Sequence, residues 1–343
     1  MRITFVAYPG GKPWNGATLY NEPLGGSEAA VGYMARAFAR LGHAVTVWSH
    51  GESTVTDGVL YQNLGHGITV RGDADVLVVS RWTEMLKQLQ TNPHCLRILW
   101  LHDMPQGFSG EVPAHAVFPI SEFQARAWQL IGKNIYVTAD GVDLDIFRPV
   151  PFEGRDINSL VWISNPDRGL PVAAHIFQQL RQRWPDLQLH VYGRSAVYGW
   201  GSEAEMPYLP QPEYMENIIL HDPLPRPALG PVLGKAWAMF YPTWWPETFC
   251  MAALEAQACG TPVICTPAGA LVETVQGGIV GFDFLNAVSQ LRNTARWRKV
   301  SATGMEWAQQ FGWESIARGW CETFDELRQT IGGRNGNSGS GTT

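Results

Sequence analysis

The sequence has few cysteines and lacks a long hydrophobic run. Its five cysteines are odd in number, form no C-x-x-C pair and stand in apolar segments, which excludes a disulfide framework and a zinc knot. No apolar run reaches the roughly 18 residues that a membrane-spanning helix requires. The apolar run in residues 1–7 is too short for the core of a signal peptide, so a first strand and a cytoplasmic protein are predicted.

An excess of positive charge is also missing. Lys and Arg number 25 against 31 Asp and Glu, a formal net charge of −6. Residues 1–145 contain 10 basic and 13 acidic residues, and residues 146–343 contain 15 and 18, so neither half is basic. This balance does not favour nucleic acid or an anionic membrane, although a modified base as acceptor and peripheral membrane contact stay open. Arg outnumbers Lys by 20 to 5, which leaves single Arg side chains as candidates for phosphate binding.

The chain does have the composition of a globular protein, with 45% hydrophobic residues. Its 343 residues correspond to two domains of roughly 100 to 200 residues each. Short β-rich runs alternate with amphipathic patterns in both halves, which is typical of βαβ units and predicts an α/β fold with parallel sheets. Strands are expected at residues 2–8, 44–49, 76–80, 97–102, 116–120, 160–164, 188–192, 238–241 and 262–266. Helices are expected at 27–41, 83–90, 122–131, 171–184, 248–259, 268–274, 284–298 and 314–331.

Residues 140–151 have the composition of a linker, with a Gly, two Pro and several acidic residues. We place the domain boundary there, which predicts an N-terminal domain at 1–145 and a C-terminal domain at 146–331. The last residues, 332–343, are rich in Gly, Ser and Asn and are expected to be a disordered tail.

Two glutamates, Glu247 and Glu255, carry the strongest local signal. They flank a helix predicted to open near Thr248, directly after a strand and a proline-bearing loop. The free N–H groups at such an opening can bind a phosphate, and the candidates are the main-chain groups of Thr248, Phe249, Cys250 and Met251. Carboxylates beside a phosphate site suit hydroxyl groups, a combination that describes a nucleotide sugar. The alternative is a helix-dipole charge at Glu247 and a solvated Glu255. An almost wholly apolar helix around Glu255 argues against it, because a buried carboxylate needs a partner.

The pattern Glu247-x7-Glu255 with Phe249, followed by Glu-Ala-Gln-Ala-Cys-Gly-Thr-Pro-Val-Ile at 255–264, resembles the signature of the retaining GT-B glycosyltransferases of family 4. Further landmarks stand in the family's order at residues 24–30, 41–47, 141–149 and 167–170. The resemblance implies two Rossmann-like domains with parallel sheets facing across a cleft, and a last helix that packs back on the N-terminal domain. It implies a hexosyltransferase that moves a sugar from a UDP-, GDP- or similar sugar to an acceptor hydroxyl with retention. The N-terminal domain would then be the acceptor side.

The resemblance also implies roles for single residues. Glu247 would contact hydroxyls of the donor sugar and Glu255 would hold the nucleotide ribose. His102, at a strand end, would face the sugar and diphosphate, and Arg168 would stabilise the charge on the leaving nucleotide. Glu247, His102 and Arg168 are therefore the predicted catalytic residues. The sequence departs from the family pattern where relatives often have a second Arg, at Trp162 or Ile163, and where they have Gly instead of Cys250.

Other motifs are weaker. The loop Gly25-Gly26-Ser27-Glu28, which opens the first long helix, is either a cleft loop or a simple helix cap. Gly193 and Arg194, at a strand end, are candidate nucleotide contacts. Trp244 and Trp245 would stack on a sugar or pack the core. Asp143-Leu-Asp145 is similar to the D-x-D metal motif but stands in the linker, so no metal is expected, and the donor substrate replaces any cofactor.

Several alternatives stay open at this stage. A different GT-B reaction such as epimerisation is disfavoured by the Glu pair. A catalytically weak nucleotide-sugar-binding or scaffold protein is the second candidate, because the second Arg is missing. A Cys250 nucleophile is disfavoured since no supporting His or Asn motif accompanies it. The acceptor, a glycan or lipid-linked sugar by default, is not specified by the sequence, and no obligate protein partner is evident.

Overall fold

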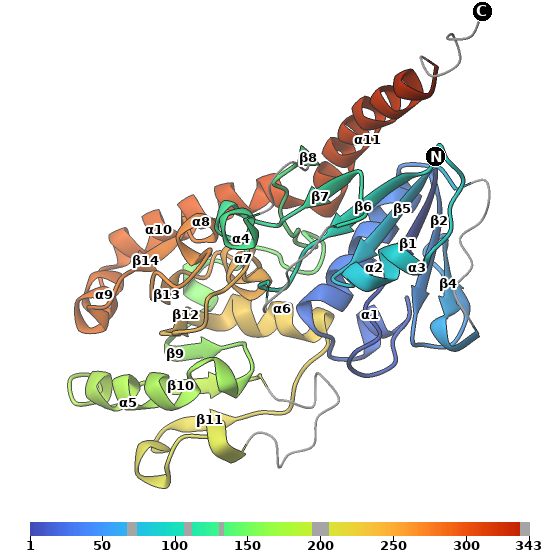
Figure 1. Cartoon of the computed structure of the whole chain (residues 1–343). Helices are drawn as coiled ribbons and strands as arrows, with labels where there is room; N and C mark the ends of the chain where they lie inside the picture. Colours follow the sequence, from blue (N-terminus) through green and yellow to red (C-terminus); the bar gives the residue numbers. More distant parts are fainter. Residues whose placement is uncertain (67–73, 106–111, 130–133, 194–205, 337–343) are drawn as a thin grey trace, which may run out of the picture. The chain divides into compact units, whose positions relative to one another are not determined.

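A computed structural model describes residues 1–66, 74–105, 112–129, 134–193 and 206–336, which group into two compact units (Figure 1). The first unit consists of Met1–Leu19, Gly26–Ala139 and Trp313–Thr343, and the second of Tyr20–Gly25 and Asp140–Gly312. Asp140, where the main segment of the second unit begins, lies within the predicted linker. The domain limits at residues 145 and 331 stay predictions.

The first unit is built on one largely parallel sheet with the strand order β3-β4-β2-β1-β5-β6-β7-β8. Its strands are β1 (Arg2–Val6), β2 (Ala44–Ser49), β3 (Thr54–Thr56), β4 (Val59–Asn63), β5 (Val76–Ser80), β6 (Leu96–Trp100), β7 (Ala116–Phe118) and β8 (Asn134–Ile135). Within the described part of this sheet, only β3 and β4 pair antiparallel. The turn between these two strands is Asp57-Gly58, with positive φ at both residues, the combination that a tight hairpin needs. The hairpin was not predicted, although its dipeptide signals it.

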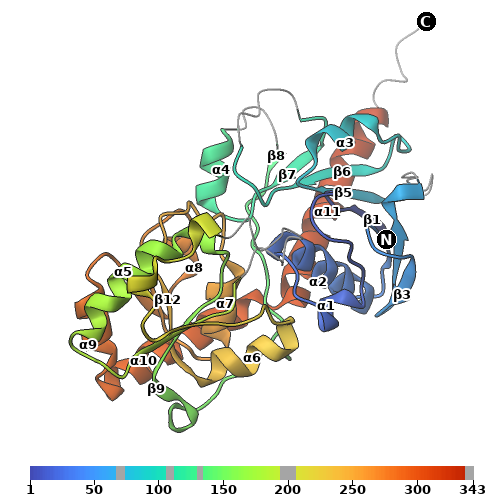
Figure 2. The same ribbon diagram turned by 90° about the horizontal axis from the view of Figure 1, so that it is seen from below.

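Helices cover both faces of this sheet, because alternate residues of its buried strands point to opposite sides. Val6, Leu77 and Val79 pack with Met85 and Leu86 in one cluster. On the other face, aromatic side chains form ring contacts among Phe5, Phe38, Trp100, Phe118, Trp320 and Phe324. The helices of the unit are α2 (Gly26–Arg40), α3 (Thr83–Gln88), α4 (Glu122–Trp128) and α11 (Trp313–Gly336). The short helix α1 (Thr18–Asn21) is divided, since Leu19 groups with the first unit and Tyr20 with the second. The last helix, α11, packs on α2 and β6 (Figure 2).

The second unit has a fully parallel sheet in the order β11-β10-β9-β12-β13-β14. Its strands are β9 (Asp156–Trp162), β10 (Gln188–Val191), β11 (Ile218–Leu220), β12 (Ala236–Tyr241), β13 (Val263–Cys265) and β14 (Gly278–Val280). Its helices are α5 (Leu170–Arg181), α6 (Arg226–Lys235), α7 (Met251–Ala258), α8 (Leu271–Thr274), α9 (Phe284–Leu291) and α10 (Thr294–Ala308). The order reverses beside β9, so β9 and β12 form the switch point where α/β sheets bind ligands.

Two helical predictions for the second unit need correction. The helix expected at 284–298 is two helices, because the Asn293 side chain accepts a hydrogen bond from the Arg296 N–H at 2.9 Å and caps a new helix there. Helix α6 was not predicted, because prolines crowd this segment. Pro225 precedes the helix and Pro227 lies in its first turn, where the missing N–H costs nothing.

The last helix continues to Gly336, beyond the predicted end at Ile331. Residues 337–343 of the expected disordered tail lie outside the described part of the chain. Among the described residues, none of the helices combines the length and the apolar character that crossing a membrane requires.

Candidate active site

The carboxyl ends of β9 and β12 bring Arg168 and Glu247 together. Arg168 belongs to a short 3-10 turn (Pro166–Arg168) that follows β9, and Glu247 lies in the loop between β12 and α7. Parallel neighbours end at the same edge of a sheet, so the two loops meet although 79 positions separate their residues. This edge is the candidate active site of the second unit.

The Glu247 carboxylate is buried and fixed from two sides. It is 5% exposed, and its Oε1 accepts hydrogen bonds from Arg168 Nη1 at 2.8 Å and from the Tyr241 hydroxyl at 2.5 Å. Ser164 Oγ lies 3.0 Å from the same hydroxyl. Burial and the nearby Glu247 charge raise the pKa of Tyr241 well above its usual range, so the phenol stays protonated as a donor. Among the described residues, none donates a hydrogen bond to the second oxygen, Oε2. This oxygen is therefore available to accept hydrogen bonds from hydroxyl groups.

The position of Arg168 is equally constrained. Its guanidinium carbon lies 5.0 Å from the centroid of the Trp245 ring, and its carbonyl oxygen accepts a hydrogen bond from Thr243 Oγ1 at 2.5 Å. A stacked, charge-paired guanidinium keeps one orientation. Trp245 therefore supports Arg168, whereas its neighbour Trp244 is 60% exposed.

The Glu247 loop depends on a close backbone contact with Gly269. The Ala270 N–H donates to the Glu247 carbonyl oxygen at 2.7 Å. Gly269 has φ +61, and a Cβ atom there would lie 2.3 Å from the same oxygen. A side chain at position 269 would thus combine left-handed strain with a backbone clash.

We expect Gly269→Ala to destabilise the protein more than Gly42→Ala. Gly42 also has positive φ, +85, but its Cβ would meet nothing within 4 Å, so Gly42→Ala costs only about 1–2 kcal/mol of left-handed strain. The clash with Glu247 adds at least about 1 kcal/mol for Gly269→Ala. Urea unfolding of the two variants measures the difference. Equal losses would show that the Glu247 loop moves without cost.

The predicted helix start needs correction. Helix α7 begins at Met251 after Cys250, which has φ +77, so Thr248 and Phe249 lie in the loop and Glu247 does not share a helix with Glu255. Left-handed backbone at Cys250 stops the helix from extending toward Thr248. The N–H groups that lack an intrahelical acceptor belong to the first turn, from Met251 onward. Burial, reinforced by Glu247, raises the pKa of the Cys250 thiol well above its usual range, which disfavours thiolate chemistry.

The partner that the sequence required for Glu255 is Arg226. Arg226 Nε donates to Glu255 Oε1 at 2.8 Å, and the side chains are only 12% and 2% exposed. A second nitrogen of Arg226, Nη1, lies 3.3 Å from the Leu24 carbonyl oxygen in the same unit. Sequence reasoning missed Arg226, because it stands in the unpredicted helix α6. Its only signal was a lone basic residue in a proline-rich apolar segment.

The remaining predictions for the second unit differ in outcome. Gly193 follows β10, and a Cβ atom there would lie 1.5 Å from the Ser164 carbonyl oxygen, so a glycine is needed where the loops after β9 and β10 touch. Arg194 lies outside the described residues. The Asp143 carboxylate accepts a hydrogen bond from the Asp145 N–H at 3.0 Å, an ordinary linker turn.

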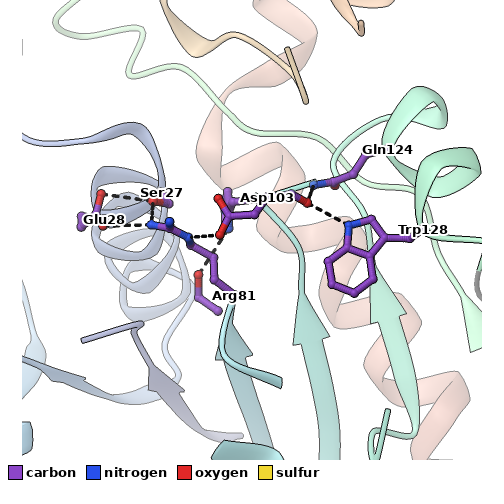
Figure 3. A network of polar contacts seen from close by, with 8 residues as sticks. Ser27, Glu28, Arg81, Asp103, Gln124 and Trp128 are labelled. Atoms are coloured by element: carbon purple, nitrogen blue, oxygen red, sulfur yellow. Dashed lines mark hydrogen bonds and ion pairs between the residues drawn. The ribbon is translucent and has the colours of Figure 1, made fainter. Parts of the chain in front are cut away.

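The predicted residues of the first unit lie at the carboxyl edge of its own sheet. His102 follows β6, is buried, and its Nδ1 lies 3.3 Å from Ser80 Oγ. Ser27 and Glu28, in the first turn of α2, contact Arg81, which sequence reasoning did not single out (Figure 3). Gly26 begins α2, while Gly25 groups with the second unit.

Comparison with known proteins identifies relatives of part of the chain. Residues 158–296 match the family of glycosyl transferases described as group 1. The D-inositol 3-phosphate glycosyltransferase of Kribbella flavida is 35% identical over 226 residues, 58% of this chain and 52% of the relative. The D-inositol 3-phosphate glycosyltransferase of Frankia alni is 28% identical over 215 residues, which cover 56% of this chain and 53% of the relative. The chain thus spans about half the length of these relatives.

Two solved structures have the same fold over nearly the whole chain. Sucrose-phosphate synthase from Thermosynechococcus elongatus has a TM-score of 0.72 at 18% identity and covers 96% of this chain and 100% of its own. Anabaena HepE in complex with UDP-glucose has a TM-score of 0.72 at 14% identity, covering 95% and 100%.

The fold class is therefore GT-B, built from two Rossmann-like units with parallel sheets, as the sequence predicted. Within that class, residues 158–296 match the group 1 glycosyl transferases, the family that the sequence resembles. The predicted resemblance is confirmed.

Proposed function

We propose that the protein is a retaining glycosyltransferase that moves a sugar from a nucleotide-diphosphate sugar, such as a UDP- or GDP-sugar, to an acceptor hydroxyl. The observation that carries the proposal is the Glu247 carboxylate, buried and fixed by Arg168 and Tyr241 through one oxygen. Burying a carboxylate costs stability. A buried, fixed carboxylate at the end of a strand therefore indicates a functional group. The match of residues 158–296 to the group 1 glycosyl transferases and the UDP-glucose complex of HepE support the same class of donor.

Each residue then has a role in the transfer. Glu247 accepts hydrogen bonds from sugar hydroxyls through Oε2 and so orients the anomeric carbon. Arg168 stabilises the negative charge that develops on the leaving diphosphate, together with the N–H groups of the first turn of α7. Glu255, paired with Arg226, holds the ribose hydroxyls. The transfer needs no covalent enzyme intermediate.

A catalytically weak nucleotide-sugar-binding protein is the second candidate, and Trp162 favours it. Trp162 occupies one of the positions where relatives often supply a second Arg, and it is fully buried with its Nε1 donating to the Ser164 carbonyl oxygen at 2.9 Å. An apolar ring there adds no positive charge near the phosphates. Such a protein would bind donor without forming a donor-derived product.

Nucleotide binding provides the test of the donor class. We expect one of UDP, GDP, ADP, CMP and TDP to stabilise the chain, by roughly 2.7 kcal/mol at about 100 times its dissociation constant. Thermal unfolding with each nucleotide measures the gain. Glu255→Gln, which keeps the shape of the side chain, should weaken the effect, whereas Glu153→Gln on the exposed surface should leave it intact. Stabilisation by none of the five would contradict the proposal.

A further inference from the structure

A second polar cluster lies at the carboxyl edge of the first unit's sheet. Arg81 directly follows β5, and its side chain lies between the loop after β6 and the first turn of α2 (Figure 3). Its Nε donates to Asp103 Oδ2 at 2.7 Å, and its Nη1 donates to Ser27 Oγ at 2.7 Å and lies 3.3 Å from Glu28 Oε1. Three segments distant in sequence thus meet at one guanidinium.

The cluster is built rigidly. Arg81 has φ +66, a left-handed backbone that a non-glycine residue adopts at a cost and that is typical of functional sites. The Asp103 carbonyl oxygen accepts hydrogen bonds from Gln124 Nε2 at 3.0 Å and from Trp128 Nε1 at 2.8 Å, both on α4. The backbone of Asp103 is therefore held by α4, while its carboxylate contacts Arg81. Side chains that bind a ligand are commonly held in place by supporting hydrogen bonds of this kind.

The charge of the cluster argues against an anionic ligand. One guanidinium and two carboxylates, those of Asp103 and Glu28, sum to a net charge of −1. Burial lowers the pKa of Arg81, but the attraction of Asp103 and Glu28 outweighs burial and raises it. The guanidinium therefore stays protonated, and the two carboxylates already balance its charge. Its remaining N–H donors together with the carboxylate oxygens suit vicinal hydroxyls.

An apolar cavity is lined by Trp82, the residue that directly follows Arg81. The Arg81 guanidinium lies 5.1 Å from the centroid of the Tyr8 ring, which is 41% exposed and meets the Trp82 ring edge to face at 6.1 Å. Trp82 in turn lines a cavity of about 420 Å³, a size typical of small-molecule sites. Its lining is mainly apolar, with Leu64, Trp82, Met85 and Leu89, and includes His50 and Gln88 as polar side chains.

We propose that the first unit binds a neutral acceptor that combines vicinal hydroxyls with an apolar aryl group, the hydroxyls at Arg81 and the aryl group in the cavity beside Trp82. The proposal rests on the proposed transferase function, because it names the acceptor class of that reaction. It excludes a sugar phosphate as the preferred occupant of this site, since the cluster has a net negative charge. The Tyr8–Trp82 ring pair connects the polar and apolar parts.

Calorimetric binding to the full chain tests the acceptor class without turnover. The probes are the methyl and phenyl glycosides of glucose, galactose and mannose, with glucose 6-phosphate as the anionic competitor. For at least one sugar, the phenyl glycoside should bind about tenfold or more tightly than the methyl glycoside, because the ring leaves water for the cavity. Glucose 6-phosphate should bind more weakly than that phenyl glycoside.

A matched pair of variants on α3 locates the aryl group. Gln88→Trp fills the cavity from its exposed side and should abolish the phenyl preference, while Lys87→Trp, one residue away and outside the lining, should keep it. Loss of the preference in both variants, no phenyl preference in any sugar, tighter binding of glucose 6-phosphate, or binding of no probe would each overturn the proposal. Nucleotide stabilisation reports on the second unit, so failure of the donor assignment is measured separately.

Discussion

Replacing Arg168 by Ala is expected to lower kcat/KM for the nucleotide-diphosphate sugar by about 10²–10³, the usual effect of removing one preorganised donor to a developing charge. Arg168 is the only side chain that we assign to the leaving diphosphate, and it also donates to Glu247 Oε1 at 2.8 Å. Loss of Arg168 therefore removes the positive charge that stabilises the leaving diphosphate. Among the described side chains, it leaves Tyr241 as the hydrogen-bond donor to the buried Glu247 carboxylate. Release of nucleotide from the donor, measured with and without acceptor, gives the rate.

Two further variants separate this effect from a general loss of charge. Arg168→Lys keeps the charge but not the planar fork that stacks on Trp245, so we expect an intermediate rate. Arg298→Ala removes an exposed Arg of the same unit, 54% exposed beside Glu153, and should leave the rate unchanged. If Arg168→Ala retained full activity, the diphosphate would have to be stabilised elsewhere, and the assignment of Arg168 would be wrong.

Replacing Arg226 by Ala is expected to lower the free energy of unfolding by about 3–5 kcal/mol, because it leaves the carboxylate of Glu255 buried without its charge partner. The Glu255 side chain is only 2% exposed, and its Oε1 forms an ion pair with Arg226 Nε at 2.8 Å. Denaturant unfolding monitored by tryptophan fluorescence measures the loss. Nucleotide binding should weaken in parallel, since Glu255 is the proposed ribose ligand.

The control is an Arg–carboxylate ion pair on the exposed surface of the same unit. Arg148 and Asp145 lie 3.4 Å apart with side chains 70% and 76% exposed, so Arg148→Ala should cost less than about 1 kcal/mol. A double replacement, Arg226→Met with Glu255→Leu, should regain much of the stability, because it removes both buried charges. A small effect of Arg226→Ala alone would mean that Glu255 finds another partner, and the pair would not be needed for the fold.

Much of the architecture could be predicted because it depends on local pattern. Two strands, 44–49 and 76–80, have the predicted limits, and Gly42, with positive φ, follows α2 as expected of a cap. Where local signals conflicted, prediction failed. Prolines concealed α6, and the strong capping of α10 by Asn293 divided a pattern that looked continuous.

The sequence by itself determined the α/β fold class, because apolar periodicity is a property of short segments, and it singled out Glu247 and Glu255, whose roles in donor binding stay predictions. It also required a partner for Glu255 without naming it. The tertiary structure alone decided the partners: Arg226 for Glu255, Tyr241 and Arg168 for Glu247, and Asp103 and Glu28 for Arg81. The Arg168–Glu247 and Arg81–Asp103 pairs join loops that follow different strands of one sheet, and only the order in which parallel strands assemble sets which loops meet.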